Sequence, residues 1–432
     1  MNNLQFEEFP ATSFDQWKKA VMKELGEKGF ESIQWNNPNG FAVEPYFSGT
    51  QVRSDIDKPE TWAIYQEVDG KTASEVNRKA LQCLKGGANA IGFAFKIAQE
   101  EDLRSLLQGI FVEYISVHFV HPDNDDRTID WFLTFCDERK LEAAQINGSI
   151  VTASHSGSQF ANLPYWIKVT SRFPGLRILP VNAILIHECG GQAIHELSFA
   201  LAMGQELIHQ LDHVGVDPAL VVQKLQFNFS TGSSYFNEIA KYRAFRLLWK
   251  TVLKAYQLDQ SERADCYIHA ETSRFQQTTK DHYNNLLRAT TQCMSAIIGG
   301  ADDVHVIPSY EANGSSSEIS LRLSRNIQHL LMEESYFHQA GDVAKGSYYI
   351  EELTAWIVNK AWDLFLEIEK KGGIFKCGAW FNGLVFEALQ KQQQAIADGE
   401  RIVVGVNKYQ NRNEKMTASA KDNSLTGFLE KE

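Results

Sequence analysis

The chain has 432 residues, of which 44% are hydrophobic and 11% aromatic, so it can bury one large core or two smaller ones. Its formal net charge of −12, without a run of lysine and arginine, argues against a nucleic-acid-binding function. The first residues lack the basic and then apolar run of a signal peptide, and no apolar stretch approaches the roughly 20 residues of a membrane span. The six cysteines form no CxxC pair, so we expect a soluble, cytoplasmic protein with reduced thiols.

Residues 1–57 are expected to form an N-terminal arm. A helix from Ser13 to Leu25 has an apolar stripe, and Ser13 suits its N-cap. The following residues are rich in turns and aromatic side chains, which need a surface to lie on. Two interpretations stay open: the arm packs on its own domain, or it wraps a partner subunit.

Short apolar strands alternate with amphipathic helices over residues 58–410. This order predicts an α/β protein with a (β/α)8 TIM barrel and an extended N-terminal arm, and a doubly wound open sheet is the competing fold. Residues 411–432 are expected to be a polar, loosely ordered tail. The expected strands are Ala88–Phe95, Tyr114–Phe119, Gly148–Ala153, Pro180–Ile186, Lys224–Phe229, Cys266–Glu271, Val304–Ile307 and Ile402–Val406.

Polar residues lie where these strands end, which is where barrel proteins place their working side chains. They contain no serine or cysteine in a recognisable nucleophile turn, and no glycine-rich phosphate loop precedes a helix. A single histidine in such a position is most often a hydrogen-bonded wall residue. The polar residues are His118, His121, His155, His187, Glu188, Asn228, Ser230, Glu271 and His305.

Histidine pairs suggest metal sites only weakly, and we expect no metal. His209 and His213 are four apart and could share one helical face, but the acidic residue of a metalloprotease motif is not in place. His187 and His195 are separated by a Gly-Gly turn. The segment from Asp303 to Pro308 echoes a cobalt-binding Asp-x-His-x-x-Gly motif, but proline replaces the glycine. We therefore interpret its histidine, His305, as a wall residue.

Several segments, in order, resemble the barrel domain of the methylmalonyl-CoA mutase family. They are FPATSFDQWKKAVMKEL, PNGFAVEPYF, FNEIAKYRAFRLLW, DHYNNLLRATTQCMSAIIGGADDVHVIP, RLSRNIQHLLMEES, KGSYYIEELT and VVGVNKYQ. The resemblance covers the chain from Phe9 to about Tyr409. It implies a (β/α)8 barrel, and an arm that embraces a partner subunit. A cobalamin-binding domain normally accompanies such a barrel, and this chain is expected to end before one.

The departures from the family pattern fall at its working positions. The family's fourth strand ends in Gly-Tyr-His, whose histidine binds the thioester carbonyl, and the tyrosine and histidine correspond to Ile184 and Leu185. Leucine cannot donate a hydrogen bond. Near the family's CoA-binding arginine stands Tyr267, and its Thr-Ser-Gly turn ends here in Arg274. Glu188 is retained.

Two further departures concern loops that contact the substrate. The family's Arg-Gly-Pro-Tyr segment before the first barrel strand is replaced by GTQVRSDIDKPETWAIY, residues 49–65. Residues 150–174 are expected to be too short for its substrate-carboxylate loop. The remaining polar residues would then be the remains of a pocket: His187, Glu188, Glu271, Arg274 and His305.

This pattern resembles the small, non-catalytic subunit of heterodimeric methylmalonyl-CoA mutases. The resemblance implies that the chain has no catalytic residue and binds no cofactor. Adenosylcobalamin and the acyl-CoA would sit in a catalytic large subunit, and the chain could form a homodimer when alone. One alternative is an acyl-CoA mutase barrel that uses cobalamin from a separate chain. A weaker alternative is a CoA-binding module with a sensing role.

Overall fold

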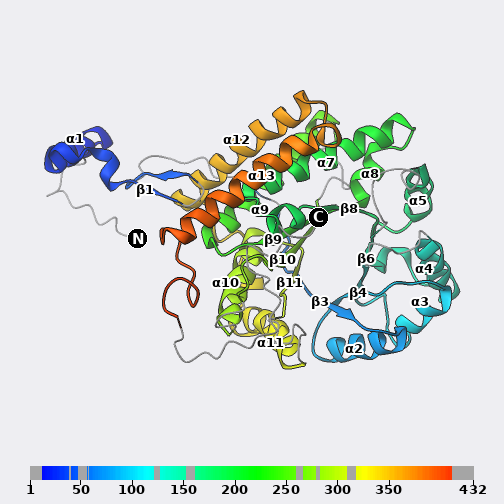
Figure 1. Cartoon of the computed structure of the whole chain (residues 1–432). Coiled ribbons are helices and arrows are strands. Elements are labelled where there is room, and N and C mark those ends of the chain that lie inside the picture. The colour runs from blue at the N-terminus through cyan, green and yellow to red at the C-terminus, as the bar shows by residue number, and fades with distance from the viewer. Residues whose placement is uncertain are drawn as a thin grey trace, which may run out of the picture.

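The structure is a computed structural model that describes residues 12–37, 40–46, 56, 58–120, 127–151, 161–258, 266–278, 283–308 and 318–410. A parallel sheet is surrounded by helices (Figure 1). The strands of this sheet are β3 (Ala63–Asp69), β4 (Ala90–Ala94), β5 (Ser116–Phe119), β6 (Asn147–Ile150), β7 (Gly175–Arg177), β8 (Leu179–Asn182), β9 (Leu225–Thr231), β10 (Ile268–Thr272) and β11 (Asp303–His305).

The sheet closes on itself as a barrel. Its hydrogen-bonded order is β7-β6-β5-β4-β3-β11-β10-β9-β8, and every pairing is parallel. The two strands at the ends of this order, β7 and β8, are separated in the chain by Ile178 alone, and its N–H donates to the carbonyl of Lys224. They therefore share one position in the ring, so the nine strands make an eight-position (β/α)8 barrel. The expected fold is confirmed.

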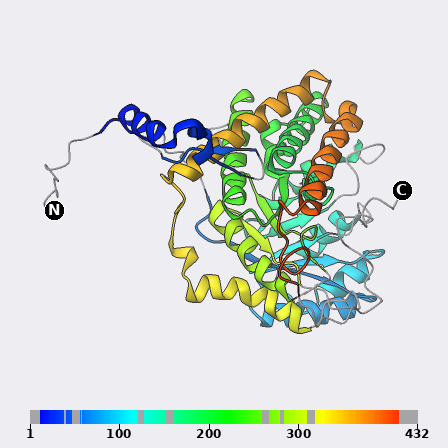
Figure 2. The same ribbon diagram turned by 60° about the vertical axis from the view of Figure 1, so that its left-hand side comes forward.

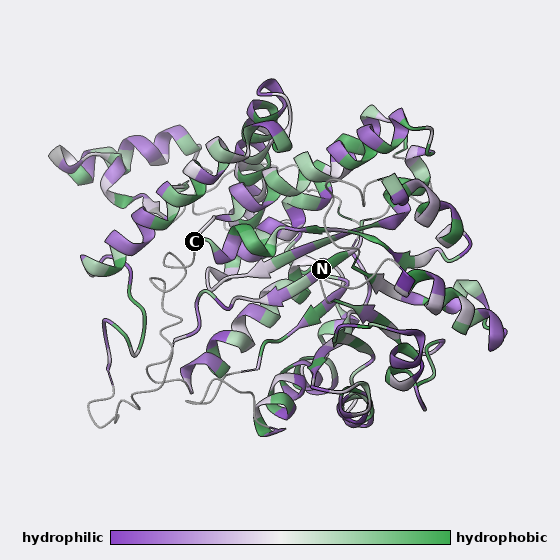
Figure 3. Cartoon of the chain, turned by 45° about the vertical axis from the view of Figure 1, so that its right-hand side comes forward, coloured by the Kyte–Doolittle hydropathy of each residue, from purple (hydrophilic) through white to green (hydrophobic). Residues whose placement is uncertain are grey.

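Helices on the outside cover the barrel, and in Figure 3 they carry both hydrophilic and hydrophobic residues. Side chains on the outer face of the strands, such as Phe227, pack on them; its ring lies 4.7 Å from that of Trp249. No helix in the described ranges is long and apolar enough to cross a membrane. The helices are α2 (Ala73–Lys85), α3 (Glu100–Leu106), α4 (Arg127–Glu138), α5 (Leu163–Thr170), α6 (Ile184–Glu188), α7 (Ala193–His213), α8 (Pro218–Lys224), α9 (Tyr235–Ala255), α10 (Asn284–Gly299), α11 (Glu318–His329), α12 (Tyr348–Lys370) and α13 (Ile374–Ala397).

The strands of the structure differ from the expected ones at several places. Ile402–Val406 is not a barrel strand: its segment turns back on itself, and the side chains of Ile402 and Val404 are about half exposed. The first barrel strand is β3, which was missed because polar Gln66 and Glu67 interrupt its apolar run. Because β3 is the first barrel strand, the strand that was matched to the family's fourth strand, now β8, takes the fifth position in the ring. Residues 184–186 are not strand but the start of α6, because the chain leaves the sheet after β8.

The N-terminal arm has two parts. Its hairpin, β1 (Trp35–Asn36) and β2 (Ala42–Val43), lies against α12, where the ring of Phe41 is 5.7 Å from that of Trp356. Helix α1 (Phe14–Leu25) has the predicted Ser13 cap but no buried residue, and it projects away from the barrel (Figures 1 and 2). The hairpin therefore packs on the barrel domain, whereas the rings of α1 contact Phe30 and Tyr46 of the arm. The expected tail, residues 411–432, lies outside the described residues, and the domain boundaries stay predictions.

Candidate functional site

Four of the predicted residues form a connected group at the C-terminal end of the barrel, which we call the mouth cluster: Glu188, Glu271, Arg274 and His305. Glu188 Oε1 accepts a hydrogen bond from the Arg274 backbone N–H at 3.1 Å. Arg274 Nε donates to Glu271 Oε1 at 2.9 Å, and Glu271 Oε2 lies 3.4 Å from His305 Nδ1. They come from α6, from β10 and the residues after it, and from β11. The structure thus brings together residues that are up to 117 positions apart.

Burial and charge act differently on the two carboxyl groups of the mouth cluster. Burial raises the pKa of Glu188, and the negative charge of Glu271 raises it further. Burial also acts to raise the pKa of Glu271, but Arg274 and His305 outweigh it and lower the value to about 2. Glu271 is therefore ionised and paired, while Glu188 Oε2 is buried and has no hydrogen-bond partner among the described residues.

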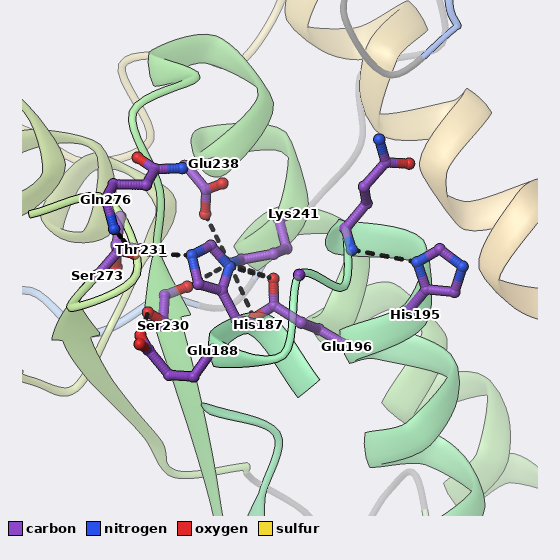
Figure 4. Close-up of polar contacts among 12 residues, drawn as sticks. His187, Glu188, His195, Glu196, Ser230, Thr231, Glu238, Lys241, Ser273 and Gln276 are labelled. Atoms are coloured by element: carbon purple, nitrogen blue, oxygen red, sulfur yellow. Dashed lines mark hydrogen bonds and ion pairs between the residues drawn. The ribbon is translucent and has the colours of Figure 1, made fainter. Parts of the chain in front are cut away.

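His187, the fifth predicted residue, faces a buried network behind the mouth cluster (Figure 4). Its Nδ1 atom is 3.2 Å from Glu196 Oε1 on α7, and its Nε2 atom is 2.9 Å from the Ser273 hydroxyl. Glu196 is in turn 3.2 Å from Lys241 Nζ on α9, which also contacts Glu238 at 2.6 Å. Burial opposes protonation of His187, but Glu196 outweighs this and raises the pKa of the imidazole. The network joins α6, α7, α9 and the end of β10.

The Ser273 hydroxyl, the His187 imidazole and the Glu196 carboxylate are spaced like a nucleophile, a base and an orienting acid. Two observations argue for a structural role. The Ser273 side chain is fully buried, and its hydroxyl accepts a hydrogen bond from the Gln276 N–H at 3.3 Å. Glu196 is also shared with Lys241. The Ser273 hydroxyl is therefore enclosed by protein atoms. We infer that Ser273, His187 and Glu196 stabilise the fold.

Below the mouth cluster, aromatic rings fill the barrel interior. The ring of Tyr65 lies 5.1 Å from His118, 4.8 Å from His269 and 5.1 Å from His305. Its hydroxyl occupies the place beside Gly92, where a Cβ would lie 1.8 Å from it. Barrel interiors usually hold branched aliphatic side chains, so this polar, aromatic layer is unusual. Its side chains come from β3, β5, β10 and β11, and together they block the barrel axis.

The residues that stand at the family's working positions lie in three different settings. Leu185 is on α6 at the mouth and is 61% exposed, and Ile184 beside it is half-buried. Tyr267 lies at the opposite, N-terminal end of β10, where its hydroxyl donates to Asp303 at 2.7 Å and its ring lies under Arg177. Tyr267 is therefore distant along the strand from the mouth cluster.

The histidine pairs do not converge on one point. His195 Nδ1 accepts a hydrogen bond from the Gln192 N–H at the start of α7, while His187 points to Ser273. His209 and His213 lie side by side on α7, with ring centroids 5.8 Å apart. In the described part of the chain no three metal-binding side chains are placed to hold an ion.

The residues around His305 do not fit a cobalamin. The imidazole is 2% exposed and is enclosed by Tyr65 and Glu271, and β11 is paired with a strand on each side. A cobalt ion in a corrin ring needs open space above the ligating nitrogen, which this position lacks. We therefore derive no chemistry from a cofactor bound to this chain.

Sequence reasoning missed several residues of the site. Glu196, Glu238 and Lys241 lie inside helices at helical spacing, where charged residues usually face solvent, and Tyr65 lies in the strand that was not predicted. His121, His155, the start of the Asp281 helix motif, and most of residues 49–57 and 150–160 lie outside the described residues.

The closed (β/α)8 barrel with a polar, titratable C-terminal end places the chain in the class of (β/α)8 barrel proteins. The sequence model of the methylmalonyl-CoA mutase family matches residues 153–427, which is more than half of the chain. The chain therefore belongs to the methylmalonyl-CoA mutase family.

Individual relatives agree with this assignment. The methylmalonyl-CoA mutase small subunit of Porphyromonas gingivalis is 32% identical over 445 residues, covering 94% of this chain and 71% of that protein. The methylmalonyl-CoA mutase of Cereibacter sphaeroides is 28% identical, covering 91% of this chain and 64% of its own length. The large subunit of Streptomyces virginiae is 25% identical, with 96% and 64% covered. The chain thus spans less than two thirds of the length of the Cereibacter sphaeroides and Streptomyces virginiae proteins.

Proposed function

We propose that this chain is the small, catalytically silent subunit of a heterodimeric, adenosylcobalamin-dependent methylmalonyl-CoA mutase. The large subunit would bind the cofactor and interconvert methylmalonyl-CoA and succinyl-CoA, and this chain would position and stabilise it. The similarity to a small subunit supports this proposal, and so does the existence of relatives named as large subunits.

The observation that carries the proposal is the hydrocarbon side chain at position 185. A thioester rearrangement needs a hydrogen-bond donor on the carbonyl oxygen, held in a site that excludes water. Leu185 offers no donor and is 61% exposed to solvent. Nearby, Arg274 is held by Glu271, and Tyr65 fills the axis below. The side chain at position 185 therefore supplies no donor to a thioester carbonyl, and the Tyr65 ring occupies the axis along which an acyl group would lie.

Helix α1 supports the proposed partner. In the described part of the chain the rings of Phe14 and Trp17 contact other arm residues, with Tyr46 5.1 Å from Trp17, and no residue of the helix is buried. An isolated helix of 12 residues is marginal in water, because too few hydrogen bonds repay its nucleation. A partner surface that covers these rings would stabilise it. We infer that α1 binds the large subunit.

Co-expression with a large mutase subunit tests the proposal. We expect a one-to-one complex by native mass spectrometry, and mutase activity that requires both chains. Trp17→Ser should weaken the complex while leaving the thermal unfolding of this chain unchanged, and Leu185→Ser, at an exposed site outside the arm, is the matched control that should leave the complex intact. Turnover by this chain with only a separate cobalamin-domain protein would instead support the alternative, an active barrel subunit.

A further inference from the structure

Solvent reaches the inner face of the barrel above the Tyr65 layer. Asn182 and Asn228 are paired across β8 and β9, and the alternate pair, Val181 and Phe227, faces outward and is fully buried. Asn182 and Asn228 therefore face inward. In a packed barrel both would be buried, yet Asn182 is exposed and Asn228 is partly exposed. Glu67, one layer above Tyr65 on β3, is also partly exposed.

This inner face is rich in acidic groups. Glu67, Glu188 and Glu271 contribute three carboxyl groups, and the Arg274 guanidinium pairs with one of them, Glu271. An excess of negative charge in a partly enclosed space favours a cationic ligand and repels the phosphates of a CoA ester.

A buried polar atom without a partner points to a hydrogen-bond donor on that ligand. Among the described residues, Glu188 Oε2 has no hydrogen-bond partner, although the Glu188 side chain is at least nine-tenths buried. This oxygen is an acceptor, so a donor on a ligand would satisfy it. Glu188 reaches over the inner face, since its Oε1 lies 3.4 Å from the Ser230 hydroxyl on β9.

A metal ion does not fit these carboxyl groups, because no three ligands in the described residues converge on one point. A primary ammonium group does, since it carries one positive charge and three N–H donors on a compact centre. We propose that the inner face of the barrel's C-terminal half binds a small organic ammonium ion, with Glu188 as its main partner. This site is independent of the proposed partner subunit and of mutase activity.

Isothermal titration calorimetry of the full chain with 1,3-diaminopropane tests the proposal. We expect saturable binding that tetramethylammonium, which has the charge but no N–H donor, does not reproduce. Glu188→Gln should weaken binding by at least about tenfold, because it removes a charge-assisted hydrogen bond. Circular dichroism should establish that Glu188→Gln is folded. If that variant is unfolded, Glu67→Gln provides a second variant for the same binding measurement. Glu100→Gln, an exposed residue on α3, is the matched control and should bind like the unmodified chain.

Protonation gives an independent reading. Because the ammonium ion binds the carboxylate form of Glu188, whose pKa is raised by burial, binding should weaken as the pH is lowered. Three results would overturn the proposal: no binding of the diamine at millimolar concentration, equal binding of tetramethylammonium, or unchanged binding by both glutamine variants. Binding of acetyl-CoA in competition with the diamine would also contradict it.

Discussion

Lys241 and Glu196 form an ion pair in which both side chains are fully buried, with Nζ 3.2 Å from each carboxylate oxygen. The pair joins α9 to α7 behind β9, and Glu238 and the Ser230 carbonyl complete the contacts of the ammonium group. Burial opposes both charges. The attraction between them outweighs it, so the pKa of Lys241 is raised and that of Glu196 is lowered.

Removing the cation of this pair should destabilise the chain strongly. Lys241→Met leaves two buried carboxylates without their cation, and we expect a loss of about 3–5 kcal/mol in the free energy of unfolding. Urea unfolding followed by circular dichroism measures it. Lys79→Met removes an exposed pair with Asp69, where a loss of at most about 1 kcal/mol is expected. Equal losses in the two variants would contradict the role of the buried pair.

His118 should make the fold sensitive to acid. Burial lowers the pKa of its imidazole to about 4, whereas an unfolded chain binds this proton near 6.5. The unfolded state therefore binds the proton more readily. The stability that neutral His118 permits is fully present above pH 6.5, and about 3 kcal/mol is lost as the pH falls toward 4.

His118→Asn is the matched change, because its amide can still bond to Ser149, which lies 2.9 Å from His118 Nδ1. Urea midpoints between pH 7.5 and 4.5 should fall less steeply for this variant than for the unmodified chain. His209→Asn, on the exposed side of α7, should follow the unmodified chain. Parallel curves for His118→Asn and the unmodified chain would mean that His118 titrates normally.

The close approach of Tyr65 to Gly92 predicts a strong coupling between the two positions. Gly92→Ala would place a Cβ 1.8 Å from the tyrosine hydroxyl, so we expect a loss of about 1–3 kcal/mol from overpacking. In a Tyr65→Ala background the same change should cost far less. A double-mutant cycle of unfolding free energies gives the coupling, and additive effects would show that the tyrosine does not fill this place.

Lys224 caps the end of α5 from inside the protein. Its side chain is fully buried, and Nζ donates to the carbonyls of Thr170, Phe173 and Leu176 at 2.6 to 3.0 Å. Lys224→Met removes three buried hydrogen bonds, although the Thr170 and Phe173 carbonyls keep backbone donors, and should cost about 1–3 kcal/mol. Hydrogen exchange should then rise first in α5. Lys168→Met, on the exposed face of the same helix, should leave exchange unchanged.

Local patterns in the sequence predicted the barrel well, because its strands and helices have a clear period. Helix α7, helix α9 and the Ser13 cap of α1 lie where that period and the capping residue placed them. Strand β3 escaped prediction since its inward residues Tyr65 and Glu67 are polar or aromatic, unlike the aliphatic residues of usual barrel strands. Ile402–Val406 had the expected composition, but within the described residues it forms an isolated bridge, between Val404 and Lys408, and no strand.

The sequence by itself determined the family, the alternation of strands and helices, and the polar residues at strand ends, because these depend on local order along the chain. Only the tertiary structure decided that Arg274 pairs with Glu271 and Glu188, that His187 turns to Glu196, and that Tyr65 fills the barrel axis. Such contacts join residues up to 204 positions apart, as between Tyr65 and His269, and they depend on how a closed sheet aligns its strands. No local pattern contains that alignment.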